Sequence, residues 1–453
     1  MKKRLSIVLS VLMILSLTVN GFATELMKRG TRGENVREVQ EMLIAQGYLE
    51  GDADGIFGPR TEAAVLAFQQ EEGLDATGIV GEGTWQALEN GGEGTEAGSD
   101  EVIIGEAAQA AEAPEEPIDR SKTFPSWNPD STALGELTAF VSGCTDESGL
   151  DYLAPEDRIA VFDMDGTILC EKAPVYFDYC LTVHRVLDDP TYHATEEERE
   201  AMQQVRDHAN SEGKVFDPEG INKADLVATA FAGMTPEEFR SYVVDFADHT
   251  QAVGFEGMTY GQSFYKPMIE VIDYLRDNDF DVWMVSACER EVVRALVQRY
   301  DFPFDHVIAT DVPYIASGKG DAPADEYNMG QDEVILLGEP LDEVECGKSG
   351  KPAAIAREIG KQPVLAFGNS TGDYSMLNYA ESNPAHTGMG FFVVCDDTQR
   401  EYGSDEKAAD YYEEVEKQSW TAISMANDWQ TIYGDGVRKT ELPGAGETLE
   451  NAA

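Results

Sequence analysis

Hydrophobic residues follow a helical pattern near the beginning of the chain. Within residues 28–89, a first amphipathic helix ends at Gly47 and places on one face Val36, Val39, Leu43 and Ile44. A second helix follows, which Thr61 can cap and whose inward positions are Ala64, Val65 and Phe68. A further short segment is Thr84–Leu88. The spacing predicts a small helical domain over residues 28–89.

Beyond residue 120, short apolar runs of strand length alternate with helical patterns. The predicted strands are residues 159–162, 280–286, 306–310, 363–368 and 388–394. Four helices are expected between the first two strands, at residues 174–187, 195–210, 223–231 and 235–249. A helix at residues 265–276, a β-hairpin within residues 315–339 and a closing helix at residues 420–433 complete the pattern. This order predicts an α/β fold with a helical insertion after the first strand.

The first predicted strand ends in two acids one residue apart, Asp163 and Asp165. Side chains at positions i and i+2 point the same way, so both carboxylates can meet at the carboxyl end of the strand, where open α/β sheets bind ligands. Gly166 allows a sharp turn, and Thr167 offers a hydroxyl and an N–H to an anion. Such close carboxylates repel each other, and a divalent cation is the usual remedy. Taken alone, the motif also fits a solvated turn at a strand end.

Later strand ends and helix starts carry polar residues of a similar kind. The second strand ends in the hydroxyl of Ser286. Lys351 opens a helix and fits its context better than Lys348, the alternative lysine. The strand at residues 363–368 runs into Asn369-Ser-Thr-Gly-Asp373, a glycine-containing turn with an acid at the start of a helix. The acids are therefore expected to gather at one edge of the sheet.

These four segments, in this order, resemble the motifs of the haloacid dehalogenase (HAD) superfamily. The long helical insertion is similar to the cap of its phosphoserine and phosphorylcholine phosphatase-like branch. The resemblance implies an α/β, Rossmann-like parallel sheet over residues 120–435, with a cap at about residues 170–262 that closes over the substrate. A closing cap excludes water from the reaction.

The resemblance also implies roles for individual residues. Asp163 is expected to be the nucleophile, Asp165 the general acid and base, and Lys351 the cation that neutralises charge at the phosphoryl group. The implied cofactor is Mg²⁺, held by Asp163, Asp165 and Asp373. Further contacts to phosphate or substrate are implied at Thr167, Glu171, Ser286, Ala287 and Asn369. Many members have an acid where Asn369 stands, so here Asp373 must supply most of the anionic contact of this motif.

The substrate is expected to be a small phosphomonoester. Glu171, Tyr176, Phe177 and Tyr179 could face the pocket, and aromatic rings with a carboxylate can hold a quaternary ammonium, which is compatible with a phosphocholine-like compound. The same aromatic residues are also suited to the core of the cap. The sequence leaves both interpretations open.

The first domain carries a motif of its own. The pattern DGxFGxxTxxAVxxFQxxxGLxxxG, present from Asp54 to Gly78, resembles the three-helix peptidoglycan-binding domain of exported bacterial proteins. The resemblance implies a non-catalytic module that holds the protein at the cell wall. The alternative is a helical spacer that has lost its ligand.

Residues 1–23 have the features of a secretory signal. Lys2, Lys3 and Arg4 precede an apolar core at residues 7–19 and the small residues Gly21 and Ala23. The apolar run is shorter than the roughly 20 residues that span a bilayer, so stable membrane insertion is not expected, although a retained anchor is the alternative. We therefore expect a secreted, wall-associated protein.

Residues 90–118 are predicted to be an acidic flexible linker, and residues 436–453 a disordered tail.

Composition restricts the possible partners. The chain has 85 acidic and 33 basic residues and a net charge of −52, which argues against nucleic acid or anionic membranes as partners. Six cysteines without CxxC spacing make a zinc site improbable on sequence grounds.

Two rival hypotheses remain: a wall-binding scaffold with a degenerate HAD fold, which Asn369 alone supports, and a wall lytic enzyme, for which no separate motif is present.

Overall fold

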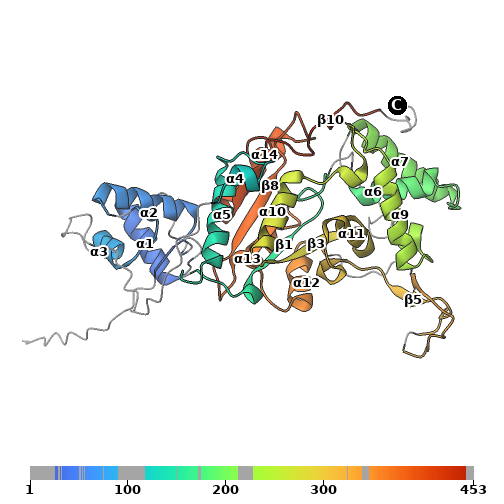
Figure 1. Cartoon of the computed structure of the whole chain (residues 1–453), viewed down its shortest axis with the longest axis horizontal. Coiled ribbons are helices and arrows are strands. Elements are labelled where there is room, and N and C mark those ends of the chain that lie inside the picture. The colour runs from blue at the N-terminus through green and yellow to red at the C-terminus, as the bar shows by residue number, and fades with distance from the viewer. Residues whose placement is uncertain are drawn as a thin grey trace, which may run out of the picture. The chain divides into compact units, whose positions relative to one another are not determined.

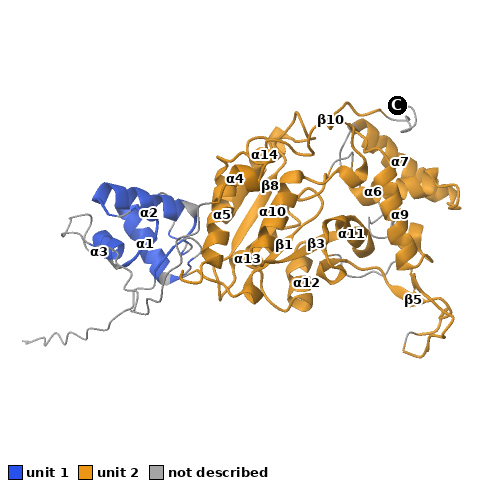
Figure 2. Cartoon of the chain, viewed as in Figure 1, with its two compact units in different colours: residues 1–109 blue, residues 110–453 orange. Residues whose placement is uncertain are grey.

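The computed structural model describes residues 26–28, 31, 33–49, 51, 53, 55, 57–74, 76–89, 118–149, 151–171, 175–212, 228–323, 325–338 and 346–444. The chain forms two compact units, residues 1–109 and 110–453 (Figure 2). The predicted signal at residues 1–23 lies outside the described residues, as do residues 90–117 of the linker and residues 223–227 of the helix predicted at 223–231, of which residues 228–231 are helical. Among the described residues, no helix combines the length and apolar character needed to cross a bilayer.

The first unit contains three helices around one apolar core. They are α1 (Glu34–Ala45), α2 (Pro59–Glu72) and α3 (Glu82–Glu89). Val36, Val39 and Leu43 are fully buried, as the helical pattern predicts. The prediction that Thr61 caps the second helix is wrong: the N-cap is Gly58, and Thr61 lies within α2. Its buried hydroxyl instead accepts a hydrogen bond from Gln40 Nε2 at 3.0 Å, joining α2 to α1.

A six-stranded parallel sheet forms the centre of the second unit (Figure 1). Its order is β4-β3-β1-β7-β8-β9. The strands are β1 (Ile159–Phe162), β3 (Asp281–Glu289), β4 (Val307–Thr310), β7 (Leu365–Gly368), β8 (Met389–Val394) and β9 (Thr421–Ser424). The first strand is central, with Ala160 paired to Val282 on one side and Leu365 on the other. The carboxyl ends of β1, β3 and β7 therefore lie next to one another.

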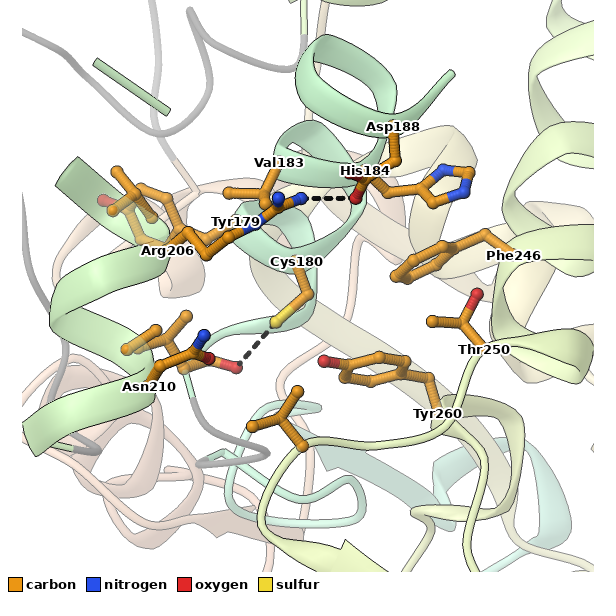
Figure 3. Close-up of a pocket in the computed structure, with 14 residues that line it drawn as sticks. Tyr179, Cys180, Val183, His184, Asp188, Arg206, Asn210, Phe246, Thr250 and Tyr260 are labelled. Atoms are coloured by element: carbon orange, nitrogen blue, oxygen red, sulfur yellow. Dashed lines mark hydrogen bonds and ion pairs between the residues drawn. The ribbon is translucent and has the colours of Figure 1, made fainter. Parts of the chain in front are cut away.

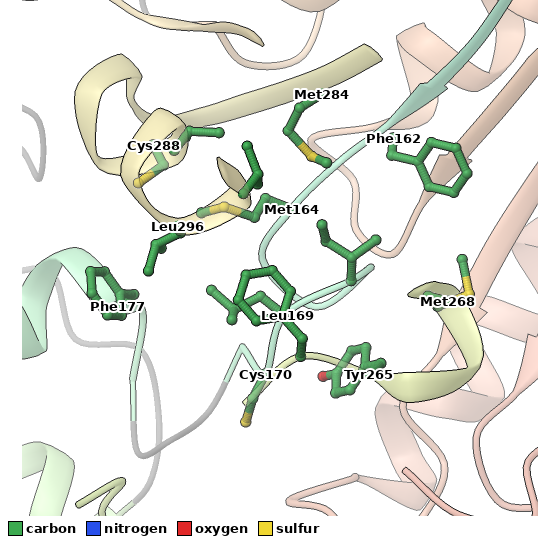
Figure 4. Packing of buried hydrophobic residues seen from close by; sticks show 14 of the residues in the cluster. Phe162, Met164, Leu169, Cys170, Phe177, Tyr265, Met268, Met284, Cys288 and Leu296 are labelled. Atoms are coloured by element: carbon green, nitrogen blue, oxygen red, sulfur yellow. The ribbon is translucent and has the colours of Figure 1, made fainter. Parts of the chain in front are cut away.

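Both faces of this sheet are buried, which explains the continuous apolar character of β1. Ala160 and Phe162 belong to one hydrophobic cluster, and Ile159 and Val161 belong to the other. Figure 4 shows part of the first cluster, where Phe162, Met164 and Leu169 are drawn with Met284 and Cys288 of β3. The loop after β1 is thus held by packing on the core.

Helices flank the sheet. They are α4 (Arg120–Thr123), α5 (Thr132–Thr145), α10 (Lys266–Asp277), α11 (Arg290–Val297), α12 (Gly350–Glu358), α13 (Tyr374–Glu381) and α14 (Asp405–Gln418). Short 3-10 turns occur at Pro155–Asp157, Tyr260–Gln262, Gln298–Tyr300 and Phe304–His306. The α/β fold with a parallel sheet is confirmed.

A helical insertion follows β1, as predicted. It contains α6 (Phe177–Val183), a π-helical turn (His184–Asp188), α7 (Glu196–Glu212) and α9 (Pro236–His249). Thr235 and Glu238 form the capping box expected at the start of α9. We call this insertion the cap; α9 joins it to the core through Arg240, whose Nη1 donates to Glu291 Oε2 of α11.

The last part of the unit differs from the sequence prediction. Residues 420–433 do not form a closing helix, because Thr421–Ser424 is strand β9 at the edge of the sheet. The expected disordered tail is also ordered at its start. Arg438–Lys439 forms β10, which pairs antiparallel with β2 (Phe255–Glu256), and Thr440 N donates to Gly254 O. The predicted hairpin is present, as β5 (Tyr314–Ala316) and β6 (Ile335–Leu337).

Candidate functional site

The site lies at the carboxyl end of the central strand. Asp163 immediately follows β1, and its backbone N–H donates to Phe367 O of β7 at 2.9 Å. This bond fixes the start of the turn against the neighbouring strand. The Asp163 side chain is 7% exposed, so the carboxylate sits in a largely desolvated position.

Lys351 brings together the acids of the first and last motifs. Its Nζ donates to Asp163 Oδ1 at 2.5 Å, to Asp373 Oδ1 at 2.7 Å and to Val285 O at 2.8 Å. The lysine is the second residue of α12 and is 2% exposed. Lys348, the alternative from the sequence, is exposed. Two acids 210 positions apart in the chain therefore contact the same ammonium group.

The charges at this contact depend on one another. Burial raises the pKa of Asp163, the charge of Asp373 raises it further, and Lys351 acts in the opposite direction. Burial acts to lower the pKa of Lys351, but the two carboxylates outweigh it and raise the pKa above the usual range. The lysine is therefore charged at neutral pH, and the site holds more negative charge than one lysine can balance.

The Asp373 carboxylate is oriented by the turn that precedes it. Its Oδ2 accepts hydrogen bonds from the backbone N–H groups of Asn369 and Ser370, both at 3.0 Å, and from Ser370 Oγ at 3.2 Å. A Cβ on Gly368 would lie 2.4 Å from the Asp373 Cβ. Glycine at 368 thus lets the acid fold back over the end of β7.

Asn369 contacts the first motif rather than standing apart from it. A Cβ on Gly166, where φ is +83°, would lie 1.9 Å from Asn369 Nδ2. Thr167 Oγ1 is 3.4 Å from both Asn369 Oδ1 and Asp163 Oδ2. The amide at 369 is therefore packed on the turn that carries the two acids.

We expect Gly166→Ala to damage this contact and Gly233→Ala to serve as a matched control. Both glycines have φ near +85°, so each variant should lose about 1–2 kcal/mol of unfolding free energy from backbone strain. Nothing lies within 4 Å of a Cβ at 233, whereas at 166 the Asn369 amide must move, adding about 1–3 kcal/mol. Urea unfolding of both variants measures the difference, and equal losses would contradict it.

The second motif contributes Ser286 and Ala287 of β3, which continues beyond the predicted strand end at Ser286 as far as Glu289. Ser286 is fully buried, and its Oγ accepts a hydrogen bond from Cys288 N at 3.1 Å. Ala287 O accepts a hydrogen bond from Thr310 Oγ1 of β4 at 2.9 Å. These bonds fix the strand end directly beyond Val285, whose carbonyl contacts Lys351.

Asp165 lies on the side of the site that faces the cap. It is 9% exposed, and its carboxylate lies within 4.8 Å of ligand atoms of Asp178 and Cys288. Asp178 belongs to α6 and was not identified from the sequence, because no motif or spacing connects it to the strand ends. Only the folded position of the cap places this acid here.

Comparisons with known proteins agree with this geometry. Residues 160–378, which hold all four motifs, match the family model for haloacid dehalogenase-like hydrolases. The second unit contains a HAD-like hydrolase domain. Residues 32–88 match the model of a peptidoglycan binding domain. The predicted resemblance to HAD-like hydrolases is confirmed for residues 160–378, and the predicted resemblance to a peptidoglycan-binding domain for residues 32–88.

Curated relatives match this chain over short stretches. Spore cortex-lytic enzymes from Bacillus cereus and Bacillus subtilis (strain 168) are each 39% identical, over 70 and 72 residues. These matches cover 16% of this chain and 27% and 24% of the relatives, so the chain spans about a quarter of their length. A solved protein of unknown function from Anaerococcus prevotii is 14% identical, with a TM-score of 0.43, covering 66% of this chain and 92% of its own.

A pocket in the HAD-like unit opens beside Asn369. Glu171 lies on one side of it, 8% exposed, with its Oε1 accepting from Tyr176 OH at 3.2 Å. The other wall comes from the segment after β8 and from α14, and includes Tyr402, Lys407 and Tyr411. This wall was not identified from the sequence, because its residues form no motif and become neighbours of Glu171 only through the sheet order.

Behind this pocket lies a buried acid, Glu401. It is 1% exposed, and its oxygens accept from Tyr402 N at 2.7 Å, from Tyr433 OH and from Cys170 Sγ at 3.5 Å. Burial raises the pKa of Glu401 to about 7, although these hydrogen bonds act against the shift. The unfolded chain, with its ordinary lower pKa, releases this proton first. The folded state therefore loses stability as the pH rises from about 4.5 to about 7.

We expect Glu401→Gln to remove this pH dependence. Relative to the variant, the native chain should lose up to about 3 kcal/mol of unfolding free energy between pH 5 and pH 8. Unfolding in urea at both pH values, with a chelator present, measures this difference. If the difference in unfolding free energy between the two proteins is the same at both pH values, Glu401 keeps an ordinary pKa in the folded state.

A second cavity lies inside the cap. Its walls come from α6, α7 and α9 and from Tyr260, and it includes Tyr179, Cys180 and Phe246 (Figure 3). Tyr179 lines this cavity and is 1% exposed, and Phe177 packs edge-on against Phe246 within the cap. For these two aromatics, the interpretation as cap core is the one that the structure supports.

Proposed function

We propose that the protein is an exported, wall-associated, Mg²⁺-dependent phosphomonoester phosphatase that acts through an aspartyl-phosphate. The observation that carries the proposal is the convergence of Asp163, Lys351 and Asp373 at one buried point. A buried carboxylate next to a lysine, with a second acid two residues along the chain, supplies a nucleophile, a counter-charge and a proton carrier in one place.

The residues present fit a magnesium ion. Asp163 and Asp373 are both more than nine-tenths buried, and their oxygens are the hard ligands that Mg²⁺ prefers. Their combined charge exceeds that of Lys351, so an added cation would relieve the repulsion that raises the pKa of Asp163. Asp163, the carbonyl of Asp165 and Asp373 are the proposed ligands. When bound, Mg²⁺ would offset charge on the phosphoryl oxygens.

In the proposed reaction, an Asp163 carboxylate oxygen attacks phosphorus in line and the bond to the leaving oxygen breaks. Asp165 gives its proton to that oxygen, which leaves as an alcohol. The same carboxylate then takes a proton from water, whose oxygen attacks the acyl-phosphate and restores Asp163. Lys351 is proposed to favour the ionised form of Asp163 and to direct its carboxylate, and the 2.5 Å contact between Lys351 Nζ and Asp163 Oδ1 supports this role.

Other polar groups surround the position of the phosphoryl oxygens. Thr167, with its hydroxyl 3.4 Å from Asp163 Oδ2, and the strand end at Ser286 and Ala287 are proposed to donate to them. Asn369 is proposed to act mainly by packing on Gly166 and so positioning Thr167. If Asn369 has this positioning role, the absence of an acid at position 369 should lower activity less than the loss of an acidic metal ligand would.

The pocket beside Asn369 is proposed to take the alcohol part of the substrate. Glu171 and the rings of Tyr402 and Tyr411 line it, so a small phosphorylated metabolite fits better than a polymer. Closure of the cap is proposed to exclude water from the reaction. The aromatic and carboxylate lining is compatible with the phosphocholine-like substrate considered from the sequence.

Hydrolysis of a chromogenic aryl phosphate tests the proposal. The full chain should release the phenol in the presence of Mg²⁺ and lose activity with a chelator, and added Mg²⁺ should restore it. A panel of small phosphoesters, including phosphocholine and phosphoserine, would then rank the substrates. No turnover of any ester would favour the alternative, a wall-binding scaffold with an inactive HAD-like domain.

Association with the wall is proposed for the first unit, since residues 32–88 match a peptidoglycan binding domain. The full chain should sediment with purified bacterial cell-wall sacculi, and a chain lacking residues 28–89 should stay in the supernatant. Because the net charge is −52, the experiment should be run at moderate salt to limit repulsion from anionic wall polymers. Equal sedimentation of both chains would contradict this role.

A further inference from the structure

Three potential metal ligands from distant parts of the chain meet at the boundary between cap and core. Ligand atoms of Asp165, Asp178 and Cys288 all lie within 4.8 Å of one another. Cys288 Sγ is 3.0 Å from Asp178 Oδ1. Asp165 follows β1, Cys288 is near the end of β3, and Asp178 lies in the first turn of α6. We call these three residues the thiol–carboxylate cluster.

The cluster is buried. Cys288 is 0% exposed, Asp178 1% and Asp165 9%. Desolvation disfavours ionised carboxylates and thiolates unless a cation compensates for their charge. The Cys288 thiol donates a hydrogen bond to Asp178 Oδ1, and a divalent cation bound by all three groups would take the place of that proton and compensate for the charge of both carboxylates.

A third carboxylate adds a separate observation. Glu289, next to Cys288, is 1% exposed, and its Oε2 accepts from Val292 N at 2.8 Å. Its other oxygen, Oε1, forms no hydrogen bond with any described residue and is fully enclosed. Burial raises the pKa of Glu289 to about 8, and the charge of Asp178 adds to this. An unsatisfied buried oxygen calls for an explanation, and here it belongs to the residue that follows the cysteine of the cluster in the chain.

The ligand types distinguish this cluster from the proposed magnesium site. Mg²⁺ prefers oxygen ligands only, whereas Zn²⁺ is borderline-soft and binds thiolate together with carboxylate. Ligand atoms around a tetrahedral zinc ion stand about 3.5 Å apart, so small side-chain rotations would bring this cluster to that spacing. The sequence argued against zinc because CxxC spacing is absent, but these ligands come together only in the fold.

We infer that the thiol–carboxylate cluster is a binding site for Zn²⁺ and that an ion bound there inhibits the enzyme. Binding replaces the Cys288 thiol proton, which is released to solvent, with a sulfur–zinc bond. The ion joins Asp178 of the cap to Asp165 and Cys288 of the core. Inhibition rests on the proposed function, because it follows from withdrawing Asp165 from proton transfer; metal binding itself does not depend on that function.

Cobalt spectroscopy tests the binding directly. Co²⁺ substitutes for Zn²⁺ and gives a strong near-ultraviolet charge-transfer absorption only when a thiolate is bound. The full chain, reduced with a phosphine and saturated with Mg²⁺, should develop this absorption at about one equivalent of Co²⁺ and lose it when Zn²⁺ is added. Cys288→Ser should abolish the absorption and Asp178→Asn should weaken Co²⁺ binding by about tenfold or more.

Two other cysteines supply the controls. Cys144→Ser changes a buried thiol in α5 and should leave the absorption intact. Cys170 lies 3.5 Å from a carboxylate oxygen of Glu401 and is the rival thiolate ligand. Loss of the absorption in Cys170→Ser with its retention in Cys288→Ser would overturn the assignment. Absence of the absorption in the native chain would overturn it as well.

Activity provides the second measurement. In excess Mg²⁺, Zn²⁺ should inhibit the native chain, and the Zn²⁺ concentration for half-inhibition should rise at least about tenfold in Cys288→Ser. The variant should keep its activity without Zn²⁺, since the hydrogen bond from Cys288 to Ser286 uses the backbone N–H, which the substitution leaves in place. Equal inhibition of both proteins would refute the inhibitory role. A chain that binds Co²⁺ through Cys288 but hydrolyses no phosphoester would refute the proposed function alone.

Discussion

Lys351→Met is expected to lower the free energy of unfolding by about 3–5 kcal/mol at pH 8 in the presence of a chelator. The lysine is 2% exposed and contacts both Asp163 and Asp373, so its removal leaves two buried carboxylates without their shared cation. Protonation of one acid relieves the repulsion, so the loss should shrink as the pH is lowered to 5. Urea unfolding at the two pH values measures both effects.

Lys348→Met is the matched control for this experiment. It makes the same chemical change three residues earlier, at an exposed lysine. Its unfolding free energy should stay within about 0.5 kcal/mol of the native value. Mg²⁺ should restore part of the lost stability in the Lys351 variant, because a cation held by the same carboxylates replaces the missing charge. Similar losses in both variants would show that the buried contact contributes little.

Asp163→Asn is expected to lower kcat by about 10⁴-fold or more, since an amide cannot form the aspartyl-phosphate. Its stability should change in the opposite direction from that of the lysine variant. The pKa of Asp163 is raised in the folded state, so its ionisation costs stability above neutral pH, and a neutral side chain avoids that cost. The variant should thus be at least as stable as the native chain at pH 8 without metal. Aryl phosphate turnover and urea unfolding check the two statements.

A control separates loss of chemistry from loss of fold. Asp157→Asn alters an acid outside the site, whose partner is the exposed Lys361, and should leave kcat within about twofold. If Asp163→Asn keeps more than a hundredth of native turnover, another residue is the nucleophile. If it unfolds at much lower urea than the native chain, the Asp163 carboxylate is a structural requirement instead.

The sequence indicated the sheet and the strand ends because these features depend on local patterns. The run at Ile159–Phe162 is apolar at every position, and burial on both faces of a parallel sheet requires this. Thr235 and Glu238 specify their helix start through their own side chains. Such signals do not need the rest of the fold.

The errors fall where tertiary contacts override local preference. Trp420 to Ser424 carries apolar residues that suit a helix or a strand, and only the open edge beside β8 selects the strand. Residues 438–439 have no strand pattern of their own, but pairing with Phe255 and Glu256 orders them. Thr61 has a good capping side chain, yet the helix starts earlier, at Pro59, where φ is already fixed.

By itself, the sequence identified the acids of the first and last motifs, because an acid at a strand end is visible from its neighbours. Only the tertiary structure decided which of them contact the same ammonium group. The Lys351 ammonium reaches both Asp163 and Asp373 because β1 lies between β3 and β7 in the sheet. It alone placed Asp178 beside Cys288, because that contact depends on how the cap packs on the core, and helical spacing carries no information about it.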